Sequence, residues 1–98
     1  MSVDISKLNK AFENRMRLGI MSALMVNDSL DFNALKELLN TTDGNLASHA
    51  SALEKVEYIE VKKQFVGKKP NTTFSATKLG KKAFNLHLDA LEKLLKNR

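Results

Sequence analysis

The residues of this chain that could do chemistry are chiefly its lysines, and these are segregated. Residues 61–88 contain seven lysines and no acidic residue, whereas residues 1–60 contain six basic and nine acidic residues. The net charge of +5 therefore comes from one segment. A basic surface confined to one segment is typical of a site that binds a polyanion, and a lysine-rich solvated loop is the plainer alternative.

A second group of polar residues lies in the stretch TDGNLASHASALEK, residues 42–55. Leu46, Ala50 and Leu53 recur there with the spacing of one helix face. The other positions carry mainly glycine, asparagine, serine and histidine, although Glu, Lys and Gln would form a more stable exposed helix. A helix that enters the DNA major groove, about 12 Å wide, needs short side chains on its outer face. An ordinary exposed helix is the alternative.

The residue types on this face match the contacts that DNA offers. Asparagine can pair with an adenine edge through two hydrogen bonds, and serine and histidine can bond bases or phosphates. Glycine near a helix start lets exposed N–H groups approach phosphates. His49 lies at the boundary of the face, where a half-buried core histidine is the alternative. The predicted DNA-binding residues are Thr42, Gly44, Asn45, Ser48, His49, Ser51, Lys55, Lys62, Lys63, Lys68, Lys69 and Asn71.

Apolar periodicity predicts the helices that position these residues. The N-terminal part, up to Met25, has helical spacing and forms one long helix or two short ones that meet near Asn14. A short helix follows over residues 32–40, with Asp31 or Ser29 as its N-cap. After a turn of three or four residues, a third helix runs from 43 to about 57. Residues 31–57 therefore form a helix-turn-helix.

The lysine-rich segment has the pattern of a hairpin followed by a helix. From Tyr58 to Val66 apolar residues alternate, which predicts a strand. The stretch GKKPN predicts a five-residue turn, and TTFSA predicts a second strand. The wing then covers residues 58–76, and a last amphipathic helix covers about 77–96.

This order of elements predicts the fold class. Three helices, a basic hairpin and a final helix form a mainly α fold with a small β-hairpin, the winged helix-turn-helix. Residues 1–98 are expected to form one such domain, because the length allows a single modest core.

Three stretches of the chain also resemble a known family: NRMRLGIMSALM, TDGNLASH and KPNTTFSATKLGKKAF. Together they are similar to the short single-domain winged-helix transcriptional regulators related to the MarR and ArsR groups, over about residues 14–95. The resemblance implies a homodimeric transcription factor whose third helix enters the major groove of operator DNA. The DNA contacts that it implies are Asn45, Ser48 and His49 on that helix and Lys68, Lys69 and Asn71 at the wing tip.

The sequence departs from the family pattern at three places. The family has a glycine just before the aromatic residue that opens the wing, and this chain has Glu57. It has a leucine after the histidine, where this chain has Ala50. Its wing often carries an arginine near position 71, where this chain has Asn71.

The two terminal helices carry more apolar residues than a small core needs. We expect them to pair across a two-fold axis, which would set two recognition helices about one DNA turn, ~34 Å, apart. The alternative is that they cover one another within a monomer. The predicted dimer-interface residues are Ile5, Leu8, Phe12, Phe84, Leu88, Leu91, Leu94 and Leu95.

Other classes of function have little support in the sequence. The chain has no cysteine, its two histidines are far apart, and its glycines form no phosphate loop, so we expect no enzyme activity, metal or cofactor. No signal peptide or membrane span is expected, which makes the cytoplasm the default location. A small apolar effector, as some relatives use, stays an open alternative. The competing function is a winged-helix module that binds an acidic protein or RNA through the basic wing.

Overall fold

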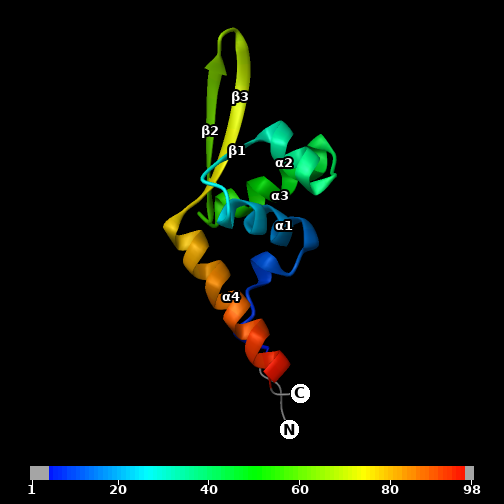
Figure 1. Ribbon diagram of the computed structural model, residues 1–98, viewed down its shortest axis with the longest axis vertical. Coiled ribbons are helices and arrows are strands. Elements are labelled where there is room, and N and C mark those ends of the chain that lie inside the picture. The colour runs from blue at the N-terminus through cyan, green and yellow to red at the C-terminus, as the bar shows by residue number, and fades with distance from the viewer. Residues whose placement is uncertain (1–4, 97–98) are drawn as a thin grey trace.

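The computed structural model describes residues 5–96, and Figure 1 shows their arrangement. The elements in chain order are η1 (Lys10–Phe12), α1 (Arg15–Met25), β1 (Leu30–Asp31), α2 (Phe32–Leu39), α3 (Asp43–Lys55), β2 (Ile59–Val66), β3 (Lys69–Ala76) and α4 (Lys78–Lys96). The molecule is elongated, 59 × 25 × 21 Å. The hairpin of β2 and β3 projects at one end and α4 at the other, with the three-helix unit between them. The predicted winged-helix class is confirmed.

Capping side chains fix where the first three α-helices begin. Asn14 accepts hydrogen bonds from the N–H groups at the start of α1, which separates this helix from η1 and confirms two short helices that meet near Asn14. Asp31 accepts from Ala34 N–H at the start of α2. Thr42 accepts from Asn45 N–H at the start of α3. Each cap satisfies a backbone donor that the helix itself leaves unpaired.

The helix-turn-helix unit has left-handed residues at both of its corners. Asn40 follows α2 with φ of 50°, and Glu57 follows α3 with φ of 62°. After α3, Glu57 N–H donates to Glu54 O and Tyr58 N–H donates to Leu53 O, the bond pattern of a Schellman motif. Glycine usually takes the left-handed place in this motif. Glu57 thus keeps the backbone geometry that the family's glycine would provide.

The hairpin is longer and its turn tighter than the sequence predicted. Val66 pairs with Lys69, so the turn consists of Gly67 and Lys68 alone. Gly67 has φ of 65°, the positive value that the first position of a type II′ turn needs. The predicted five-residue turn is therefore wrong, because β3 already begins at Lys69 and includes Asn71.

Pro70 fits inside β3 because of its place in the ladder. It lies opposite Phe65, one step beyond the closing pair Val66–Lys69. Hydrogen-bonded and non-hydrogen-bonded pairs alternate along an antiparallel ladder, so the backbone nitrogen of Pro70 points away from β2 and loses no bond.

A third strand, β1, closes the sheet at its base. Leu30 and Asp31 pair with Phe74 and Thr73, which gives the strand order β1-β3-β2. Sequence reasoning placed these two residues in a loop and at a helix cap. Among residues 5–96, no third strand pairs with the hairpin beyond this base, and Figure 1 shows the hairpin extending away from the helices.

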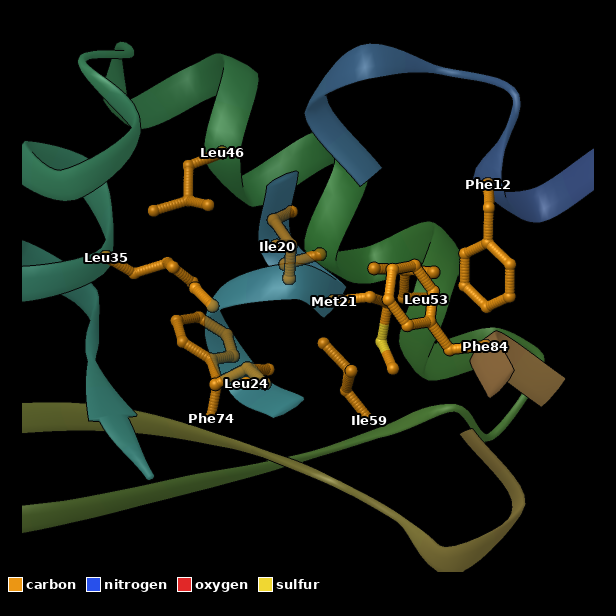
Figure 2. Close-up of a cluster of buried hydrophobic side chains, with 12 residues drawn as sticks. Phe12, Ile20, Met21, Leu24, Leu35, Leu46, Leu53, Ile59, Phe74 and Phe84 are labelled. Carbon is orange, nitrogen blue, oxygen red and sulfur yellow. The ribbon is translucent and has the colours of Figure 1, made fainter. Parts of the chain in front are cut away.

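One apolar core holds the helices on the sheet, and Figure 2 shows its side chains converging from α1, α2, α3 and the hairpin. Phe12 and Phe84 meet in this core edge to face, with ring centroids 5.0 Å apart. Both are buried within one chain, so placing them at a dimer interface was wrong: neither has surface left for a partner. The buried residues are Phe12, Ile20, Met21, Ala23, Leu24, Leu35, Leu46, Ala50, Leu53, Ile59, Phe74 and Phe84.

The N-terminal turn joins the base of the wing to α4. Asn9 N–H donates to His87 Nδ1 at 3.0 Å, and Asn9 Nδ2 donates to the Tyr58 hydroxyl at 3.0 Å. The first bond gives the buried His87 a polar partner.

Within residues 5–96, none of the helices is long and apolar enough to cross a bilayer.

Candidate nucleic-acid interface

Helix α3 has the two faces that its sequence predicted. Leu46, Ala50 and Leu53 are buried against the core. On the outer side the exposed residues have small or polar side chains over most of the helix. The predicted contact residues exposed there are Gly44, Asn45, Ser48, Ser51 and Lys55, and Ala47 and Glu54 are exposed as well.

The start of α3 is open to solvent. A Cβ atom added to Gly44 would meet no heavy atom within 4 Å, so packing inside the chain does not require a glycine there. Thr42 and Asp43 are also exposed. The free N–H groups of the first turn therefore face outward, where an anion could reach them.

The amide of Asn45 is held in place by a residue that sequence reasoning missed. Asn45 Nδ2 donates to Thr41 Oγ1 at 3.1 Å. This bond uses one of the two amide N–H groups and fixes the amide plane, while Oδ1 and the second N–H stay available for an adenine edge. The four-residue spacing from Thr41 to Asn45 was the sequence feature that could have predicted this bond.

A neighbouring ion pair moderates the acidic residue at this helix start. Lys36 Nζ lies 2.7 Å from Asp43 Oδ1, and both side chains are partly exposed. The carboxylate of Asp43 would otherwise repel phosphates near the first turn of α3. The lysine offsets this charge locally.

His49 is half-buried and bonded to α1. Arg17 Nη1 lies 3.2 Å from His49 Nδ1, and because a guanidinium only donates, Nδ1 is the acceptor. Arg17 Nε donates in turn to Ala11 O at 2.7 Å. Through Arg17, His49 thus links α3 to the segment before α1. Arg17 was not predicted to take part, because it lies 32 residues from His49 in sequence.

The wing lysines are divided between two faces of the hairpin. Residues directly opposite one another in a ladder share a face. Lys63 is on the face of the buried Ile59, which is turned toward the helices, whereas Lys62 is on the other face. Lys69, opposite Val66, shares the face of Lys62, as does the half-buried Asn71. Lys68 is in the turn.

A cleft lies between α3 and the wing. It has a volume of about 310 Å³ and an apolar floor that includes Phe74. Ser51 on α3 and Lys63 on the wing line this cleft, so the structure brings these two predicted residues together. Thr72 on the wing lines it as well and was not predicted. Glu54 also lines it.

The wing lysines are uncompensated. Within residues 5–96 the ion pairs are Lys36–Asp43 and Lys96–Glu92, and neither involves the wing. The same part of the chain has no group of three residues that could hold a metal ion. What the arrangement offers is positive charge on the wing and hydrogen-bond donors along the slim helix α3, which suits binding rather than reaction chemistry.

The sequence also matches known winged-helix proteins. The family described as the winged helix DNA-binding domain matches residues 16–95. A protein of Methanocaldococcus jannaschii whose function is uncharacterised is 35% identical over 88 residues, which cover 90% of this chain and 96% of that protein.

Solved structures show the same fold. A transcriptional regulator homologue from Pyrococcus horikoshii is 28% identical with a TM-score of 0.82, and the match covers 89% of this chain and 86% of that one. NadR in complex with 4-hydroxyphenylacetate has a TM-score of 0.73 at 20% identity, over 94% of this chain and 64% of that one. An ArsR family transcriptional regulator has a TM-score of 0.59 at 16% identity, over 91% of this chain and 87% of that one. The family match confirms the winged-helix resemblance seen in the sequence. The chain belongs to the family of winged-helix DNA-binding domains.

Proposed function

We propose that this protein is a transcriptional regulator that binds specific sequences of double-stranded DNA as a homodimer. The observation that carries the proposal is the outer face of α3. It is slim and polar, it begins at an open Gly44, and it lies beside a wing whose lysines have no acidic partner within the described residues. Family membership supports DNA as the partner.

In this proposal α3 lies in the major groove and reads bases through Asn45 and Ser48. The cleft between α3 and the wing would hold a phosphate backbone strand, because Ser51, Lys63 and Thr72 line it and can donate hydrogen bonds. The charge of Lys63 would there offset the carboxylate of Glu54, which lines the same cleft. Lys68 and Lys69 would then contact the backbone or the minor groove beyond that strand. The contacts to the phosphate backbone would position the protein on the duplex, and the contacts to the bases would specify the sequence.

The exposed leucines of α4 support the homodimer. Leu88, Leu91 and Leu95 are exposed along this projecting helix, Ile5 is exposed before η1, and Leu8 and Leu94 are half-buried. Pairing of these residues across a two-fold axis would place two α3 helices in successive major grooves. The proposed dimer-interface set therefore keeps these six residues.

The test is duplex binding as a function of salt concentration, using an operator selected from a random duplex library. Lys68→Glu and Lys69→Glu should weaken binding to all duplexes alike and flatten the log–log salt slope by about one unit per contact. Asn45→Ala should mainly relax the preference at one base pair. Lys93→Glu, the same charge change at the far end of α4, is the matched control and should leave the slope unchanged.

The outcomes separate this function from its competitor. A two-fold symmetric selected motif with half-sites about one turn, ~34 Å, apart supports both DNA binding and the dimer. If neither the wing variants nor Asn45→Ala alters duplex affinity, DNA is not the partner. Binding of single-stranded RNA or an acidic protein, lost in the wing variants, would then identify the interaction module.

A further inference from the structure

The tip of the wing carries an apolar group that packing does not explain. Phe65 is 74% exposed and Val66 is 61% exposed, both at the end of β2. In the described part of the chain, β1 pairs only near the base of the hairpin, and Figure 1 shows no other element beside the tip that could cover them. Water contact with a phenyl ring is unfavourable, so an aromatic residue on a projecting hairpin suggests a partner that buries it.

The ladder register gives Phe65 a defined direction. It lies opposite Pro70, and both share the face of Lys63 that is turned toward α3. Pro70 is exposed too, so the cross-strand pair leaves most of the phenyl ring uncovered. Two rigid apolar side chains therefore stand side by side at the end of the hairpin. Val66 points to the opposite face.

The surrounding charge selects the kind of partner. Lys63, Lys68 and Lys69 flank the pair, and residues 61–88 contain no acidic residue. A partner that satisfies both features has a polyanionic surface and an apolar interior close beneath it. Duplex DNA has this combination, since stacked bases lie behind the phosphates of the minor groove.

The spacing along β2 places Phe65 in a particular groove, given the proposed function on which this inference rests. If α3 occupies the major groove, the Ser51–Lys63 cleft holds the adjoining phosphate strand. Phe65 lies two residues beyond Lys63, about 7 Å further along the strand. In that arrangement Phe65 would lie beyond the phosphates, toward the neighbouring minor groove.

We propose that Phe65, supported by Pro70, is a wedge that inserts between two base pairs in the minor groove and bends the operator. Apolar side chains inserted in this way partly unstack a base step and kink the duplex toward the major groove. Pyrimidine–purine steps such as TA and CA unstack most easily. The wing should therefore prefer such a step at the insertion point without making any hydrogen bond to it.

The experiment measures DNA bending and affinity together. The selected operator duplex carries a fluorophore at each end, and energy transfer reports its bend in complex with wild type, Phe65→Ala, Phe65→Leu or Val66→Ala. Phe65→Ala should remove most of the bend and weaken affinity about tenfold. Its salt slope should stay unchanged, because no phosphate contact is lost. Phe65→Leu keeps an apolar wedge and should retain most of the bend, and Val66→Ala, on the opposite face, should behave as wild type.

Each other outcome overturns the wedge in a distinguishable way. If Phe65→Ala, with an unchanged melting temperature, binds and bends DNA as wild type does, the wedge is wrong and the DNA-binding function stands. If wild type binds no duplex, both proposals are wrong. If vesicles of anionic phospholipid bind wild type but not Phe65→Ala, while bending is unaffected, the apolar tip serves a membrane surface instead.

Discussion

Helices α3 and α4 begin with the same two residue types, which have different surroundings in the two helices. Each follows a threonine and carries a glycine in its first turn. Thr42 Oγ1 accepts from Asn45 N–H at 3.2 Å, and Thr77 Oγ1 accepts from Gly80 N–H at 2.9 Å. A Cβ atom on Gly80 would lie 2.0 Å from Tyr58 O, whereas one on Gly44 would meet nothing within 4 Å.

The difference separates residues that the fold needs from residues that it does not. The start of α4 is fastened to the corner after α3, because the Thr77 hydroxyl also donates to Glu57 O at 2.7 Å. The start of α3 has its local cap, the bond from Asn45 to Thr41 and the ion pair of Asp43 with Lys36, but no packing partner at the glycine. Intramolecular packing accounts for Gly80. Packing does not account for Gly44; under the proposed function, the close approach of a phosphate to the helix start would account for it.

The largest effect is expected for Gly80→Ala. The added methyl group would overlap backbone atoms of Tyr58, which cannot move without shifting the base of the wing. We expect a loss of about 3 kcal/mol in the free energy of unfolding and a melting temperature lower by more than about 12 °C at fixed protein concentration. Thermal melting followed by circular dichroism measures this. An unchanged melting temperature would contradict the close approach of α4 to this corner.

The next effect compares the two caps. Thr77→Ala removes both a cap and the bond to Glu57 O, whereas Thr42→Ala removes one cap bond. We expect a cost of about 2 kcal/mol at Thr77 and about 1 kcal/mol at Thr42. Urea unfolding gives both values. Thr77→Ser keeps the hydroxyl and is the control that should stay near wild type; equal costs at the two threonines would show that the bond to Glu57 O adds nothing.

A smaller change, an increase in the free energy of unfolding, is expected from a substitution at Glu57, the left-handed residue after α3. Glu57→Gly relieves a left-handed backbone residue and should stabilise the protein by about 1 kcal/mol in urea unfolding. Asn40→Gly is the matched comparison, because asparagine tolerates this conformation better and has less to gain. A stabilisation at residue 40 that equals the one at residue 57 would argue against backbone strain at Glu57.

The smallest effect on stability, and the sharpest test of the comparison, is Gly44→Ala. The substitution should stabilise α3 by about 0.5 kcal/mol, since alanine is the better helix former and the added methyl group meets nothing. Duplex affinity should nevertheless fall, because this methyl group would stand between the helix start and a phosphate. Urea unfolding and duplex titration of one preparation give both numbers. Unchanged affinity would remove the functional reason for Gly44.

Local patterns predicted most of the fold. The helical spacing of Leu46, Ala50 and Leu53 gave the buried face of α3, and the alternation after Tyr58 gave β2. Patterns that consist of only a few residues were less reliable for predicting turns and short strands. Pro70 read as part of a turn, although its position in the ladder lets it lie in β3, and the two-residue β1 is too short to show a period.

Contacts between distant residues could not be predicted in this way. Arg17 meets His49 only because α1 packs against α3, and nothing in either stretch indicates the pairing. Phe12 and Phe84 lie more than 70 residues apart, and their apolar character suits a core and a dimer interface equally. The cleft likewise exists only because residues of both wing strands lie beside α3 in the folded protein. The exposed positions of the candidate residues on α3 and the wing were thus predictable, and the residues that they contact within the chain were not.

The division of lysines between the two faces of the hairpin affects how the protein first meets its target. Lys63 is on one face, Lys62 and Lys69 are on the other, and Lys68 is at the turn. Positive charge therefore surrounds the wing and attracts a polyanion from most directions of approach. Such a field raises the rate of encounter but sets no angle of docking. In the proposed complex, orientation would come only after this encounter, from the short-range contacts that the same lysines and the outer face of α3 make with the duplex.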